Sequence, residues 1–135
     1  MKKIKAGCIL VNPVNKKIGL IYRKEYQDYS FPKGHLEEGE SLLECALRET
    51  AEETKREAIP YSEDPIAINN YQTEKEESEV YYFLVIDNGK SNNTSLETHD
   101  LIWVSYDEVA EKLSFDNLKE VWNQSKELVL EILNK

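Results

Sequence analysis

The sequence has no long apolar run, few cysteines and fewer basic than acidic side chains. None of its hydrophobic stretches approaches the roughly 20 residues that a helix needs to cross a bilayer. The apolar stretch that follows the basic start, residues 8–11, is too short for a secretory signal. We therefore expect a cytoplasmic protein with no membrane partner.

The two cysteines, Cys8 and Cys45, are too few for a disulfide framework, and Cys45 falls within a predicted helix. We expect both to be reduced core residues. The chain carries 17 Lys and Arg against 26 Asp and Glu, a formal net charge of −9. This charge repels nucleic-acid backbones and argues against a polymer substrate. Small phosphate esters stay open as substrates, because a bound metal reverses the local field of a site.

What is present fits one globular domain over residues 1–135, with 40% hydrophobic and 32% charged residues. Hydrophobic patterns predict two groups of elements. The strands are 4–11, 18–23, 66–72, 80–86 and 101–104, and the helices are one from residue 41 to between 55 and 58, one over 105–113 and one over 116–135. We expect a mixed α/β layered domain with helices on both faces of the sheet.

Several boundaries have local signals. Ser41 and Glu44 have the spacing of a capping box, as do Ser105 and Glu108, so a helix is expected to begin at each serine. The first helix should end between residues 55 and 58. Residues 80–86 are all β-favouring, which implies burial on both faces of that strand, and residues 87–94 are expected to form a polar turn.

One segment combines glycine, arginine and glutamates at fixed spacings. Its members are Gly34, Glu40, Arg48, Glu49, Glu52 and Glu53. On a helix the last three glutamates stand at i, i+3 and i+4 and share one face, where their like charges call for cations. Oxygen-only ligands suit Mg²⁺ or Mn²⁺.

This segment resembles the signature of the Nudix hydrolases, which cleave nucleoside diphosphates linked to another moiety. The resemblance implies an α/β/α sandwich with a mixed sheet and the acidic helix packed on it. Lys55 stands where the family usually has a glycine, so we expect the helix to continue or to close differently. Residues 31–41 resemble the subgroup that hydrolyses diadenosine tetraphosphate and related dinucleoside polyphosphates, or the inositol pyrophosphate enzymes.

The resemblance implies a nucleotide substrate, a phosphoanhydride bond broken by water, and one preferred substrate, a dinucleoside tetraphosphate. Alternatives are cleansing of oxidised nucleoside triphosphates, removal of pyrophosphate from RNA 5′ ends and inositol pyrophosphate hydrolysis. The acidic charge argues against the last two. A non-catalytic nucleotide sensor is a further alternative, but the intact glutamates argue against it.

The resemblance also implies residue roles. Glu49, Glu52, Glu53 and the carbonyl of Gly34 are the expected metal ligands. Arg48 can pair along the helix with Glu44 and Glu52 and so orient a carboxylate. The general base is either a helix glutamate such as Glu52 or the distant Glu97, with His99 as another candidate.

Three residues are expected to bind the substrate. Lys33 and Arg23 are the cations placed near the polyphosphate, where a lysine acts as a point charge. Tyr82, or else Tyr22 or Tyr81, could stack on a base, although strand tyrosines are more often core residues.

Overall fold

Two long strands form the centre of the fold in the computed structural model, which describes residues 2–91 and 99–135. β1 (Lys2–Asn12) and β7 (Glu77–Ser91) run parallel, in register from Lys2 opposite Glu77 to Val11 opposite Ile86. The middle of β7 is buried on both faces, as its composition predicted. β7 is longer than expected, because residues 87–91, predicted as a turn, continue the strand and pair with β5 (Arg56–Pro60).

The other strands extend the sheet on both sides of this pair. The order is β3-β2-β1-β7-β5, with β4 added to β1, β6 to β7 and β8 to β2. Each of these pairs except β1–β7 is antiparallel. The bounds of these strands are β2 (Lys17–Arg23), β3 (Asp28–Ser30), β4 (Lys33–His35), β6 (Ala67–Gln72) and β8 (Asp100–Ser105). The sheet is therefore mixed. The short strands β3, β4 and β5 were missed from the sequence.

β1 changes its antiparallel partner along its length. Residues 10–12 pair with β2, whereas residues 5–7 pair with β4. Between these stretches the Cys8 amide donates to the Pro32 carbonyl at 3.1 Å. Gly7 permits this approach, since a Cβ there would lie 2.2 Å from the Pro32 oxygen. On this side of β1 the sheet therefore divides into two parts, one that begins with β2 and one that begins with β4.

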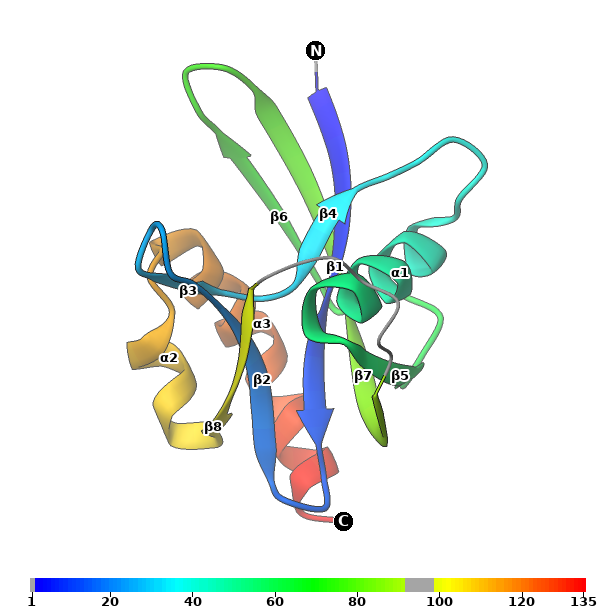
Figure 1. Cartoon of the computed structure of the whole chain (residues 1–135), viewed down its shortest axis with the longest axis vertical. Helices are drawn as coiled ribbons and strands as arrows, with labels where there is room; N and C mark the ends of the chain where they lie inside the picture. Colours follow the sequence, from blue (N-terminus) through cyan, green and yellow to red (C-terminus); the bar gives the residue numbers. More distant parts are fainter. Residues whose placement is uncertain (1, 92–98) are drawn as a thin grey trace.

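Helices cover the sheet on its two faces (Figure 1). α1 (Leu42–Thr54) packs on one face, where Cys8, Leu10 and Phe83 form a buried cluster. α3 (Asp116–Leu133) packs on the other, where the cluster includes Ile9 and Leu84. Successive strand residues point to opposite faces, which explains this division. The result is the expected α/β/α arrangement. Both cysteines are buried and free, as predicted.

The ends of α1 show one confirmed prediction and one correction. Ser41 caps the helix, and its capping box with Glu44 is complete. The helix ends at Thr54, earlier than expected. Lys55 follows in the left-handed conformation, with φ at 60°, and its amide donates to the Ala51 carbonyl at 2.9 Å. Lysine therefore makes the turn for which glycine is favoured, and the prediction that the helix would continue or close differently was wrong.

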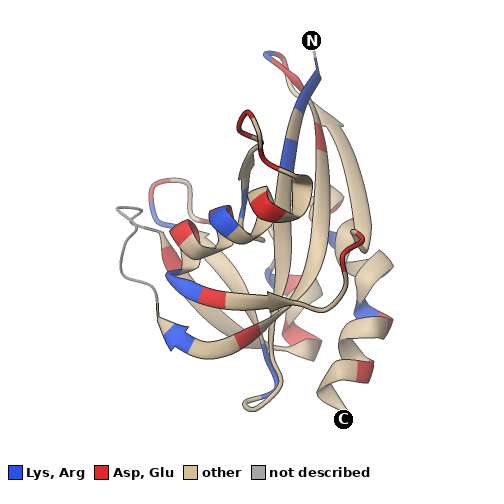
Figure 2. Cartoon of the chain, turned by 90° about the vertical axis from the view of Figure 1, so that its right-hand side faces the viewer, with Lys and Arg blue, Asp and Glu red and all other residues tan. Residues whose placement is uncertain are grey.

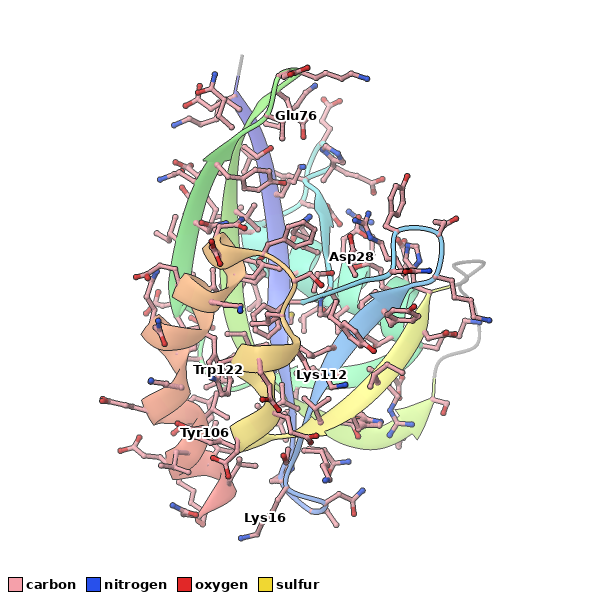
Figure 3. The ribbon with its side chains drawn as sticks, turned by 90° about the vertical axis from the view of Figure 1, so that its left-hand side faces the viewer. Lys16, Asp28, Glu76, Tyr106, Lys112 and Trp122 are labelled. Atoms are coloured by element: carbon pink, nitrogen blue, oxygen red, sulfur yellow. The ribbon has the colours of Figure 1, made fainter. Side chains whose placement is uncertain are left out.

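The C-terminal third follows its sequence signals. Ser105 and Glu108 form the predicted capping interaction ahead of a short 3₁₀ turn, η1 (Tyr106–Glu108), and α2 (Val109–Lys112). The rings of Tyr106 and Trp122 pack with centroids 5.3 Å apart and join η1 to α3 (Figure 3). Among the described residues, no helix is long and apolar enough to span a membrane.

Candidate active site

The outer side of α1 is rich in charge, and Arg48 is its centre. Figure 2 shows acidic and basic positions along α1 and the acidic loop before it. The Arg48 guanidinium donates to both carboxylate oxygens of Glu40, at 2.6 and 3.0 Å. This two-point contact lowers the pKa of Glu40. It also ties the loop before α1 to the helix.

The same guanidinium reaches two of the predicted metal ligands. Its Nη1 donates to Glu49 at 3.1 Å and contacts Glu52 at 3.4 Å, while Nη2 donates to the His35 carbonyl at 3.0 Å. Arg48 therefore has the contacts that an orienting residue needs. The expected pairing with Glu44 does not form, because Glu44 is engaged in the capping box.

Gly34 on β4 and Glu49 on α1 are packed directly against each other. A Cβ at Gly34 would lie 2.0 Å from the carboxyl carbon of Glu49. The Gly34 carbonyl faces the helix, where the Cys45 thiol lies 3.7 Å from it. The missing side chain thus lets a carboxylate and a backbone carbonyl share the narrow space between β4 and α1.

Glu53 is the predicted ligand that reaches the interior. Its carboxylate accepts a hydrogen bond from the Lys33 amide at 2.7 Å and lines a cavity. Glu52 is set apart, with its side chain 41% exposed. Within the described ranges, no three His, Cys, Asp or Glu side chains converge to hold a metal ion.

The donors present nevertheless fit a hard cation. Mg²⁺ is usually held by one or two carboxylates and completes its shell with water and substrate phosphates. Glu49, Glu53 and the Gly34 carbonyl provide hard oxygen donors on or beside β4. These residues could hold such an ion together with a phosphate-containing ligand.

The cavity has a volume of about 500 Å³, within the usual range for small-molecule sites. It lies where the sheet divides, and its lining combines strand residues with Glu53 from α1 and the start of α3. The lining residues are Lys5, Arg23, Ser30, Phe31, Lys33, Gly34, His35, Glu53, Tyr71, Thr73, His99, Phe115, Asn117 and Leu118. Basic side chains come from several segments of the wall, so the cavity suits an anionic ligand.

Both cations predicted to bind substrate lie in this lining. Arg23 is held by Asp28 through two hydrogen bonds, at 2.8 and 2.6 Å, and its guanidinium lies 4.3 Å from the ring of Tyr26. The pair raises the pKa of Arg23 and lowers that of Asp28. Lys33 lies beside Glu53 through its own backbone amide. The structure thus brings both cations to the cavity.

Sequence reasoning missed a third cation, Lys5. Its ammonium donates to Glu76 at 2.9 Å and to the Tyr71 hydroxyl at 3.1 Å. Burial alone lowers the pKa of Lys5, but the hydrogen bonds outweigh it and the pKa is raised. Burial and the charge of Lys5 also lower the pKa of His35. The sequence signal that could have indicated this role was a lysine inside the otherwise apolar stretch predicted as the first strand, residues 4–11.

The prediction that Tyr82 stacks on a base of the substrate was wrong. It is fully buried, with its ring centroid 5.8 Å from that of Phe31, and so cannot stack on a nucleotide base. Tyr22 packs on Tyr29, and the Tyr81 hydroxyl donates to Glu79. Phe115, in contrast, is an aromatic side chain that lines the cavity and is 41% exposed.

Two candidates for the general base, Glu97 and His99, lie outside α1. Glu97 lies outside the described residues. His99 lines the cavity, and its charge contributes to the lowered pKa of Asp28 after the larger effect of Arg23. His99 is therefore closer to the site than its isolated position in the sequence suggested.

Comparisons with known proteins agree with this arrangement. The family described as NUDIX domain matches residues 1–129. The 8-oxo-(d)GTP phosphatase of Mycolicibacterium smegmatis is 26% identical over 110 residues, which cover 82% of this chain and 34% of that protein. The asymmetrical bis(5′-nucleosyl)-tetraphosphatase of Rattus norvegicus is 37% identical over 92 residues, which cover 65% of this chain and 63% of that protein.

A solved structure has a similar fold. The binary complex of a C. elegans Ap4A hydrolase superimposes with a TM-score of 0.80 at 18% identity, covering 96% of this chain and 98% of that chain. At this identity the likeness concerns the fold alone. The chain spans about a third of the mycobacterial protein and less than two thirds of the rat protein.

Proposed function

Because the chain belongs to the NUDIX domain family, we propose that it is a hydrolase that breaks a phosphoanhydride bond in a nucleoside polyphosphate. One observation carries the proposal. Glu53 of the acidic helix projects into a cavity whose wall also holds Lys5, Arg23 and Lys33. A carboxylate for a divalent cation and several cations for phosphates then face the same space, which is what phosphoryl transfer requires.

The helix and β4 together form the proposed metal site. Glu49, Glu53 and the Gly34 carbonyl would hold Mg²⁺ or Mn²⁺, and the bound ion would supply charge that polarises a phosphate oxygen and the attacking water. Arg48 fixes the carboxylate of Glu49 through a hydrogen bond of 3.1 Å and keeps Glu52 nearby. Its role is to position these carboxylates, not to contact the substrate.

The cavity wall binds the polyphosphate and one base. Lys33 and Arg23 contact phosphate oxygens, and the exposed face of Phe115 stacks on a base, where stacking contributes about 1 to 3 kcal/mol.

A glutamate accepts the proton of the attacking water, either Glu52 or Glu97. The variants Glu52→Gln and Glu97→Gln separate these two, because loss of the base lowers kcat and removes one limb of the pH profile.

The preferred substrate in this proposal is a dinucleoside tetraphosphate. The likeness to the rat tetraphosphatase, at 37% identity, supports it. Cleansing of oxidised nucleoside triphosphates is the second candidate, because the chain also resembles the mycobacterial 8-oxo-(d)GTP phosphatase. The two differ in whether a second nucleoside must be accommodated beyond the phosphates.

A substrate panel tests the proposal. Diadenosine tetraphosphate, ATP, 8-oxo-dGTP, an RNA with a 5′ triphosphate and an inositol pyrophosphate are compared by kcat/KM with Mg²⁺ and with EDTA. We expect metal-dependent turnover that is fastest on diadenosine tetraphosphate, and products made in ¹⁸O-labelled water locate the bond that breaks. A faster mononucleotide would reject the preferred substrate, and no turnover of any phosphoanhydride would reject the hydrolase.

A further inference from the structure

Lys5 is a buried cation that lines the cavity. It is 7% exposed and lies on β1 directly opposite His35 on β4, next to the pair formed by Ala6 and Gly34. Lys33 is paired with Gly7, two residues from Lys5, so the side chains of Lys5 and Lys33 lie on the same face of the β1–β4 pair, and Glu53 contacts the Lys33 amide. A phosphate chain that begins beside Glu53 can therefore extend toward the ammonium of Lys5.

The ammonium of Lys5 forms an ion pair with a carboxylate. Glu76 lies in the turn between β6 and β7 (Figure 3). It accepts from Lys5 at 2.9 Å and from the Ser78 hydroxyl at 3.2 Å, both through Oε1. Ser78 is fully buried, and the Tyr71 hydroxyl lies 3.1 Å from the Lys5 ammonium. An ammonium and a hydroxyl thus donate to one anionic oxygen, while the Tyr71 phenol accepts from the same ammonium. Ammonium and hydroxyl groups also bind phosphate oxygens.

The two partners of this ion pair differ in how firmly they are held. The Lys5 side chain is 9% exposed, whereas that of Glu76 is 29% exposed. Lys5 is part of the central strand, and Glu76 belongs to a surface turn. An incoming anion can therefore displace the carboxylate into solvent while the ammonium stays in place.

We propose that Lys5 binds a phosphate of the substrate remote from Glu53, and that the Glu76 carboxylate occupies this site until that phosphate replaces it. The inference rests on the proposed function and adds a basis for substrate choice. A long polyphosphate chain reaches Lys5 and displaces Glu76, whereas a short chain ends before it. The turn between β6 and β7 thus selects for the length of the phosphate chain.

Binding of inorganic tripolyphosphate and pyrophosphate, measured by calorimetry without turnover, tests the inference. In Glu76→Gln the anion no longer competes with a charged partner, so tripolyphosphate should bind about three- to tenfold more tightly, with a smaller change for pyrophosphate. Glu74→Gln is the matched control, because it removes the same charge from an exposed position in the same turn. It should change the affinity for both anions equally and slightly.

Two variants of Lys5 complete the test. Lys5→Met should weaken tripolyphosphate binding about tenfold, as expected for loss of a charge-assisted hydrogen bond, and Lys5→Arg should restore most of it. With nucleotides, Glu76→Gln should lower KM for diadenosine tetraphosphate while kcat stays the same. If instead Glu76→Gln lowers the melting temperature and binds tripolyphosphate like Glu74→Gln, the pair only fastens the turn and the inference is wrong.

The outcomes separate this inference from the proposed function. Failure of the wild-type chain to hydrolyse any nucleotide would reject the hydrolase and leave the anion-binding comparison to be judged by calorimetry. Normal hydrolysis with equal behaviour of Glu76→Gln and Glu74→Gln would reject the role of Glu76 alone.

Discussion

The acidic helix and the cavity wall distribute charge in opposite ways. On α1 and the loop before it, the carboxylates of Glu37, Glu40, Glu49 and Glu52 all lie within ion-pair distance of Arg48. On the cavity wall, two cations each have a carboxylate of their own, Asp28 for Arg23 and Glu76 for Lys5.

The difference explains what each region can attract. Four carboxylates around one guanidinium leave a surplus of negative charge, which favours an additional cation. A neutralised cation on the wall attracts an anion only when that anion replaces its partner. The two regions meet at β4, where Lys33 contacts Glu53 and Gly34 contacts Glu49. A metal-bound phosphate would satisfy both regions at once.

Glu53→Gln should produce the largest effect, because it removes negative charge where the two regions meet. The glutamine oxygen can still accept the hydrogen bond of the Lys33 amide, so the fold and the melting temperature should change little. We expect kcat with Mg²⁺ to fall on the order of 10²- to 10³-fold, as for loss of a strong electrostatic contact to the reacting group. Turnover close to wild type would contradict the metal assignment.

Arg48→Lys tests whether one guanidinium must serve several carboxylates. A lysine cannot hold Glu40 at two points and also reach Glu49, so kcat/KM should fall about 10- to 100-fold, as for loss of a residue that supports metal ligands. Arg56→Lys is the matched control, because Arg56 also forms a two-point contact, with Asp87. An equal loss of activity in both variants would show that Arg48 acts only through stability.

Phe115→Ala tests the apolar part of the cavity wall, which carries no charge. Loss of stacking on a base should raise KM about tenfold, with kcat nearly unchanged. Tyr82→Phe is the comparison, because the Tyr82 hydroxyl is buried with no hydrogen-bond partner among the described residues. Its removal should leave KM unchanged and stabilise the fold by up to about 1 kcal/mol in urea unfolding. A raised KM in Tyr82→Phe alone would reverse the assignment of the base site.

Lys55→Gly should have the smallest effect and concerns the backbone of α1. Lysine at a φ of 60° is strained relative to glycine, so the substitution should stabilise the fold by about 0.5 to 1 kcal/mol without changing kcat. Lys24→Gly, in an exposed turn outside the left-handed region, should instead be slightly destabilising. Thermal unfolding of both variants provides the measurement, and equal signs would contradict the strain.

The helix that carries the carboxylates could be predicted because its signals are local. Ser41 and Glu44 fix where α1 begins, and the spacing then places Glu49 and Glu53 on the side that faces β4. The cavity could not be predicted in the same way. Lys5, Tyr71 and Phe115 belong to three distant segments, and only the folding of the sheet and α3 brings them together.

Two errors have definite causes. Tyr82 was proposed to touch the substrate although its own strand was predicted to be buried on both faces, and burial decided its place. The end of α1 was misjudged because Lys55 adopts a conformation that its side chain disfavours. The tertiary contacts of the strand that follows, including the hydrogen bonds of Arg56 to Asp87, hold the chain in that turn.

The turn between β6 and β7 contacts Lys5 of the cavity lining through the side chain of Glu76. Residues 73–76 connect the two strands of one hairpin, and exchanging them would leave the helix and β4 as they are. The turn could therefore be exchanged to change the ligand preference, while the residues of α1 and β4 stay the same.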